Sequence, residues 1–76
     1  MKTFYVRLET LINQHTRRFA STDKEIVMKG GYPVHFEIYG VKRNINFILG
    51  HTLTVLQERY GQDIVLVQID KDGNQI

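Results

Sequence analysis

The residues of this chain that are chemically suited to bind a metal ion are three histidines and a short acidic segment near its end. No two of His15, His35 and His51 have the three- or four-residue spacing that turns two imidazoles of one helix toward the same ion. Residues 70–74 contain two aspartates and an asparagine, as calcium loops do, but Gly73 does not stand at the turn position of such a loop. We therefore expect no metal and no cofactor, and we interpret residues 70–74 as a solvated turn.

A set of residues with the chemistry of a small ribonuclease is also present, but nothing in the spacing brings its members together. Cleavage of RNA needs a general base, a general acid and cations near the charge of the phosphorane. The residues of suitable type are His15, Glu37, His51, Arg17 and Arg59. Because no motif fixes their geometry, a ribonuclease-type toxin is the least favoured of three functional hypotheses, and we expect that the protein is not an enzyme.

Two pairs of basic residues favour a second hypothesis, an RNA- or DNA-binding regulator. The pairs are Arg17-Arg18 and Lys42-Arg43, and Tyr39 lies close to the second pair in the sequence. Cationic side chains bind phosphates, and aromatic rings stack on unpaired bases. The formal net charge of +2 is mild, so it permits nucleic-acid binding without requiring it.

Three short motifs occur in the order found in a family of RNA-binding proteins. They are Thr16-Arg17-Arg18, Ile26-Val27-Met28-Lys29-Gly30-Gly31 and Gly40-Val41-Lys42-Arg43-Asn44. This order resembles that of the carbon-storage-regulator family of small dimers that control translation. The resemblance implies that Arg17 and Arg18 contact RNA and that residues 40–44 turn a hairpin. The chain departs from the family in its long segment before the first motif, in a longer gap after it, and in Gln57, where a second RNA-contacting arginine is expected.

The length and composition are those of one small globular domain. Seventy-six residues suffice for a single core, so we treat residues 1–76 as one domain, and a core of this size gains stability from a homodimer or another partner. Hydrophobic residues make up 42% of the chain and charged residues 24%, as in folded proteins. The sequence has no cysteine and no apolar run of about eighteen residues, which predicts a cytoplasmic protein without a signal peptide or membrane span.

The beginning of the chain has the alternation of a strand. From Phe4 to Ile12 apolar residues face one side and polar residues the other, which predicts a half-buried strand. Spacings of three and four between Phe4 and Phe19 leave a helix as an alternative. Residues 13–16 are turn-like, and residues 17–22 are either a short strand or an irregular connection.

The middle of the chain predicts a β-hairpin. Residues 25–29 and 33–41 are rich in β-forming side chains, and Gly30-Gly31 between them tolerates the positive φ angles of a tight turn. Pro33 suits the start of a strand or the edge of a sheet.

The second half predicts one helix and a final strand. Asn44 is a plausible N-cap, apolar residues from Ile45 to Tyr60 repeat at helical spacing, and Gly61 suits the C′ position. Gly50 and the β-branched residues after it lower helix propensity, so a helix limited to about 51–60, with a hairpin over 40–48, remains an alternative. Residues 64–69 are β-branched and apolar, which predicts a buried strand.

These elements together predict an α+β domain with a small, mostly antiparallel sheet of three to five strands and one principal helix packed on one face. If the other face of the sheet is open, its polar and aromatic residues would bind a partner. They are Tyr5, Arg7, His35, Glu37 and Tyr39, with Tyr32 beside the glycine turn. The favoured hypothesis is a non-enzymatic regulatory protein acting by protein–protein contact, such as an inhibitor or adaptor encoded on a phage or another mobile element.

Overall fold

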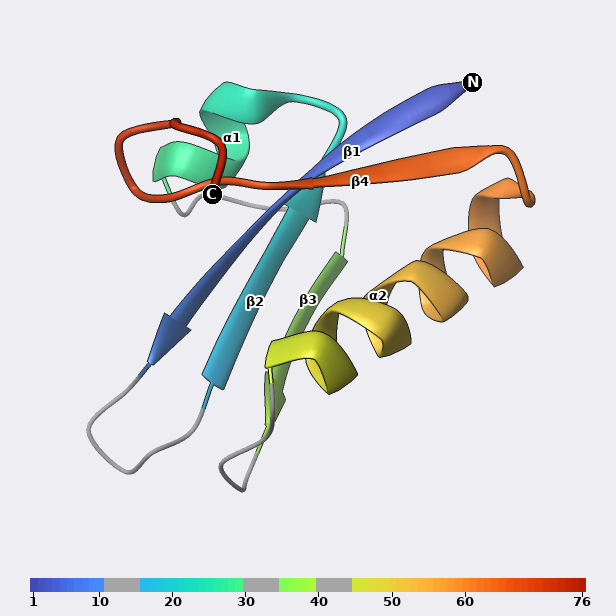
Figure 1. Cartoon of the computed structure of the whole chain (residues 1–76), viewed down its shortest axis with the longest axis horizontal. Coiled ribbons are helices and arrows are strands. Elements are labelled where there is room, and N and C mark those ends of the chain that lie inside the picture. Colours follow the sequence, from blue (N-terminus) through green and yellow to red (C-terminus); the bar gives the residue numbers. More distant parts are fainter. Residues whose placement is uncertain (11–15, 30–34, 40–44) are drawn as a thin grey trace.

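The computed structural model describes residues 1–10, 16–29, 35–39 and 45–76 and shows an α+β fold (Figure 1). The elements in chain order are β1 (Lys2–Thr10), β2 (Thr16–Ser21), α1 (Lys24–Lys29), β3 (His35–Tyr39), α2 (Ile45–Tyr60) and β4 (Ile64–Gln68). The principal helix, α2, lies in the second half of the chain, as the sequence predicts.

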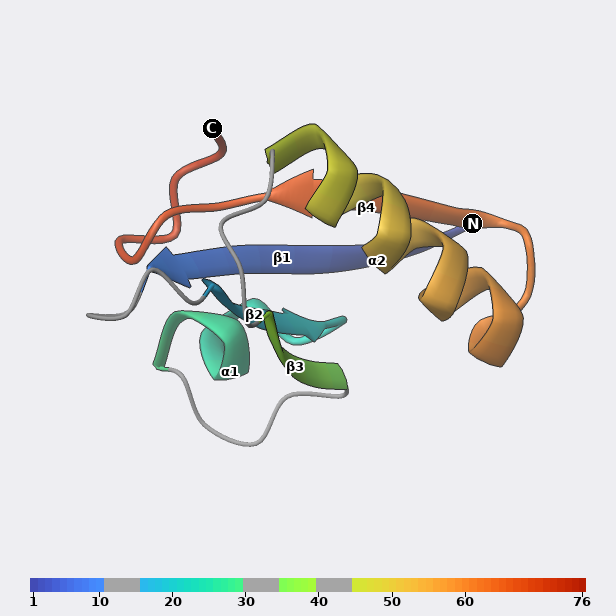
Figure 2. The ribbon, with the colours of Figure 1, turned by 90° about the horizontal axis from the view of Figure 1, so that it is seen from below.

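The sheet is mixed, with its strands in the order β3-β2-β1-β4. β1 pairs with β2, and β2 with β3, in antiparallel fashion. β4 pairs with β1 in parallel, with Lys2 opposite Ile64 at the start of both strands. The prediction of a mostly antiparallel sheet of three to five strands is thus met in outline, with β4 as the parallel exception. The pairing is parallel because α2 returns the chain to the end of the sheet where β1 begins (Figure 2).

The alternation of β1 is that of a strand, and the helical alternative for this segment is wrong over the described residues. Phe4 and Val6 are buried on the face of the sheet that α2 covers. They form a core cluster with Ala20 of β2 and Leu56 of α2, against which partly buried apolar residues of β1, β4 and α2 pack. The principal helix thus covers one face of the sheet, as the sequence predicts.

The segment predicted as the first arm of a hairpin is the helix α1, and this is a correction to the sequence analysis. Asp23 provides the reason, because its Oδ1 accepts a hydrogen bond from the backbone N–H of Glu25 at 3.0 Å, as an N-cap does. Val27, which favours strands by propensity, is buried against Phe19 and Ile69. Tertiary burial and the cap outweigh the β-propensity of the segment. The strand β3 pairs with β2 instead.

The helix α2 runs without interruption through Gly50 and ends where the sequence predicts. Gly61 follows its last residue with φ of 99°, and its N–H donates to the carbonyl of Gln57 at 2.9 Å. The alternative of a helix limited to about 51–60 is wrong, because α2 begins at Ile45. The predicted N-cap, Asn44, and the predicted turn at 40–44 lie outside the described residues.

The second face of the sheet is covered at one end by α1 and by the residues after β4. Phe19, Val27 and Ile69 form a second buried cluster there. The final residues form the predicted turn, in which Asp70 Oδ1 accepts hydrogen bonds from the backbone N–H groups of Asp72 and Asn74. The turn lies beside α1 (Figure 1), where Gly73 is buried close to Met28, while Lys71, Asp72 and Asn74 remain exposed to solvent.

Candidate interaction surface

Arg7, predicted to lie on an open face of the sheet, is only 8% exposed. Its Nε donates to the carbonyl oxygen of Val27 at 2.8 Å, and its Nη1 donates to Glu9 Oε2 at 3.1 Å. The guanidinium also lies over the ring of Phe19, 4.6 Å from the centroid. The expectation that Arg7 is exposed is therefore wrong, because α1 covers its side chain. The hydrogen bond from Arg7 to Val27 links β1 to α1.

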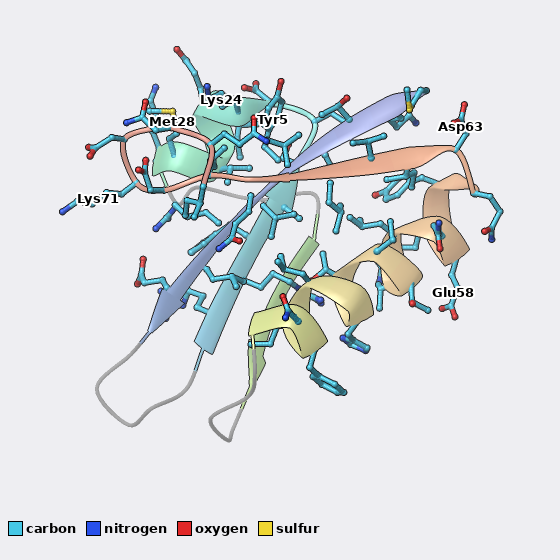
Figure 3. All side chains as sticks on the ribbon, in the orientation of Figure 1. Tyr5, Lys24, Met28, Glu58, Asp63 and Lys71 are labelled. Atoms are coloured by element: carbon cyan, nitrogen blue, oxygen red, sulfur yellow. The ribbon has the colours of Figure 1, made fainter. Side chains whose placement is uncertain are left out.

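Tyr5 is also partly covered by α1. It is half-buried, packs against the second core cluster with Met28, and has the Lys24 ammonium 5.9 Å from its ring centroid. Figure 3 shows Tyr5, Lys24 and Met28 together at α1, beside the C-terminal turn, from which Lys71 points outward. A partner that contacts Tyr5 would reach one edge of its side chain rather than an open strand surface.

The other residues predicted to bind a partner are not brought onto a described surface. His35, Glu37 and Tyr39 belong to β3, which is an edge strand of the sheet. Tyr32 lies outside the described residues. A role in partner binding stays a prediction for these four residues.

Arg18, predicted to bind nucleic acid, is fully buried between the sheet and α2. Its Nη1 donates to Thr52 Oγ1 at 2.6 Å, and the Thr52 hydroxyl donates to the carbonyl of Ile48 at 2.7 Å. Arg18 therefore cannot reach a phosphate in this structure. Arg17, on the other face of β2, is half-buried, and Lys42 and Arg43 lie outside the described residues.

The exposed side of α2 is unusual because it carries no charge over most of its length. From Ile45 to Gln57 the helix has no Asp, Glu, Lys or Arg, and its charged residues come only in the last turn. Surface helices ordinarily keep charged residues on the side facing water. We define the α2 outer face as one stripe of its uncharged part, formed by the exposed residues Phe47, Gly50 and Thr54 and the partly exposed His51.

An aromatic pair forms the apolar centre of the α2 outer face. Phe47 exposes 53% of its surface, and its ring stacks on that of His51 at an interplanar angle of 4° and a centroid distance of 6.4 Å. Because the two residues are one helical turn apart, the helix itself holds this arrangement. Sequence reasoning missed this surface, although the uncharged stretch was visible as a signal.

The ribonuclease-type set is not assembled by the described residues. His51 and Arg59 stand on α2 eight positions apart, which places them about 12 Å apart along the helix axis. Arg17 is on β2, and His15 lies outside the described part of the chain. Where the chain is described, no three His, Cys, Asp or Glu side chains are grouped as metal ligands. None of the helices in those segments is long and apolar enough to cross a membrane.

The motifs shared with the carbon-storage-regulator family fall on separate elements. Thr16-Arg17-Arg18 opens β2, and residues 26–29 belong to α1. The third motif, residues 40–44, lies outside the described residues. The chain as a whole matches no protein-family model, no curated protein and no solved structure.

Proposed function

We propose that this protein is a small, non-enzymatic regulatory protein that binds another protein through the α2 outer face. The observation that carries the proposal is the uncharged stretch from Ile45 to Gln57 on a helix that has one side in solvent. A cytoplasmic inhibitor or adaptor, of the kind encoded on mobile elements, is the form of regulator that we favour.

An uncharged helix surface with an exposed aromatic ring has the composition of the centre of a protein interface. The centres of protein interfaces are depleted of charged residues and enriched in aromatic ones, and a few aromatic anchors supply most of the binding free energy. Phe47 is such an anchor, because it is exposed and already held in place against His51. Binding would bury its ring without first having to order it, which lowers the entropic cost of association.

Nucleic-acid binding remains the alternative function, and the described residues give it little support. Of its four proposed contacts, Arg18 is buried, Arg17 is half-buried, and Lys42 and Arg43 lie outside the described residues. A protein interface centred on Phe47 should resist moderate salt, whereas phosphate contacts weaken steeply as salt rises. Salt dependence therefore separates the two functions.

The test is capture of the partner by the purified protein from a lysate of its own host, followed by a moderate-salt wash. Three forms are compared: the wild type, Phe47→Ser, and Ile76→Ser. The last is a matched control, because Ile76 is 71% exposed and lies in the C-terminal segment rather than on α2. We expect one defined protein to be retained by the wild type and by Ile76→Ser and to be lost with Phe47→Ser.

Two results would contradict the proposal. Retention of RNA or DNA that the salt wash removes would assign the protein to the nucleic-acid alternative. Retention of the same protein partner by all three forms would show that the α2 outer face is not the contact surface. Folding of each variant is checked by circular dichroism, and no loss is expected because both side chains are exposed.

A further inference from the structure

The outer edge of β4 is a second surface, built from backbone rather than from side chains. β4 is the last strand of the sheet order, so only one of its edges is paired with another strand. In its parallel ladder with β1, the N–H of Lys2 donates to the carbonyl of Asp63, and the N–H of Ile69 donates to the carbonyl of Val6. Residues 63, 65, 67 and 69 therefore bond to β1, because alternate residues of a parallel strand bond to the same neighbour.

It follows that the N–H and C=O groups of Ile64, Leu66 and Gln68 point to the outer edge. One end of this edge is already in use, since Gln68 accepts a hydrogen bond from the N–H of Ile76 at 2.9 Å. At the other end the N–H of Ile64 donates to the carbonyl of Gln62 within a turn. Between these two ends, the N–H and C=O of Leu66 and the carbonyl of Ile64 face outward.

The side chains of β4 lack the usual protection against strand pairing. Natural edge strands carry lysines, prolines or bulges that prevent another strand from adding to the sheet. β4 reads Ile-Val-Leu-Val-Gln, with no charge and no proline, and Val65 exposes 37% of its surface. An edge of this kind favours addition of a further strand.

We propose that β4 pairs in antiparallel fashion with β4 of a second copy of this chain, with Val65 opposite Val65 at the twofold axis. In this register Ile64 of one copy stands opposite Leu66 of the other. The N–H of each Leu66 then donates to the outward carbonyl of Ile64 in the other copy. The two Val65 side chains lie side by side on one face and cover each other.

The hydrogen bond from Ile76 to Gln68 excludes one alternative register. Pairing centred on Leu66 would place Ile64 opposite Gln68, where the backbone of Ile76 already occupies the edge. Pairing centred on Val65 leaves the hydrogen bond between Ile76 and Gln68 in place. This register therefore uses only the part of the edge that Ile76 leaves open.

A second copy fits this edge better than an unrelated strand for three reasons. The outward groups are self-complementary under a twofold axis, and the uncharged strand meets no like charge when it pairs with itself. A domain of 76 residues with two small core clusters gains stability from such an interface. The dimer does not use the α2 outer face, so it stands independently of the proposed function.

The test uses opposite charges at the twofold axis. Val65→Lys and Val65→Glu each place two like charges directly opposite, so each variant alone should be a monomer when the wild type is a dimer by light scattering. Mixing the two variants should restore a species of twice the mass of one chain, containing one copy of each, because the unlike charges then face each other.

If either charged variant fails to fold, a cysteine variant tests the same dimer by cross-linking. The chain has no cysteine, so Val65→Cys offers one thiol per copy, and the control Glu58→Cys places it on the far side of α2 (Figure 3). In a glutathione buffer, Val65→Cys should form the disulfide-linked dimer to completion while Glu58→Cys remains largely monomeric. Three results would overturn the proposal. The two cysteine variants could cross-link equally, or the wild type could be monomeric at every concentration. The third is a dimer that Phe47→Ser breaks and Val65→Lys leaves intact.

Discussion

Two arginines that the sequence presents as surface charges are built into the interior, one on each face of the sheet. Arg7 and Arg18 stand on neighbouring strands, and both are buried. The alternation of the strands predicts the face on which each arginine lies. Arg7 is on the face of β1 opposite to Phe4, and Arg18 is on the same face of β2 as Ala20. Their burial did not follow, because a charged residue enters a core only when long-range contacts supply hydrogen bonds, here from Val27 and Thr52.

At this scale we predict that the hydroxyl of Thr52 stabilises the fold through Arg18. Thr52→Val keeps the shape of the side chain but removes an acceptor from a buried guanidinium, which should lower the free energy of unfolding by about 1.5–3 kcal/mol. Thr54→Val is the matched control, since Thr54 makes the same hydroxyl-to-carbonyl bond to Gly50 on the exposed side of α2. Its effect should stay within about 0.5 kcal/mol. Urea unfolding measures both, and equal effects would contradict the role of Arg18.

At the scale of elements, hydrophobic periodicity and end signals predicted the helices and strands whose local propensity agrees with the fold. They did not predict the helix whose formation depends on burial in the core. β1, β3, α2 and β4 were predictable from periodicity and from the Gly61 cap. α1 was not, because its residues favour strands and a six-residue helix depends on the core that buries Val27. Asp23, the N-cap of α1, is a local helix signal that the sequence does carry.

Gly50 lowers the stability of α2 on its exposed side. It lies within the helix, is exposed, and has no atom within 4 Å of the position of an added Cβ. Gly50→Ala should therefore raise the free energy of unfolding by about 1 kcal/mol. Thermal or urea unfolding gives the value. A destabilisation instead would mean that α2 is strained at this position.

Gly73 tests the contact between the C-terminal turn and α1. Its φ is +85°, and an added Cβ would lie 2.7 Å from Met28 Sδ, whereas Gly61, at φ of +99°, has open space. Gly61→Ala should cost only the backbone strain of about 1–2 kcal/mol, and Gly73→Ala should cost more. Adding Met28→Ala to Gly73→Ala should recover part of the excess, as a double-mutant cycle would measure. Equal losses at the two glycines would show that the turn does not pack on α1.

At the scale of the whole molecule, the mixed sheet and its cover were beyond sequence reasoning. The parallel pairing of β1 with β4 joins opposite ends of the chain, and the cover over Arg7 and Tyr5 comes from α1 and the C-terminal segment. The face predicted to be open is therefore partly covered, and binding of a partner by its remaining residues stays a prediction. A dimer through β4 would place both α2 helices on the same side of a continuous sheet, so that one partner molecule with two sites would meet both outer faces.

Binding through the α2 outer face is measured most directly by calorimetry at low and moderate salt. The purified partner is titrated with the wild type, with Phe47→Ala and with Ile76→Ala. We predict that Phe47→Ala weakens binding roughly thirtyfold, equivalent to about 2 kcal/mol at an interface anchor, while Ile76→Ala and added salt change it little. Equal affinities for all three forms, or an affinity that collapses with salt, would contradict the account.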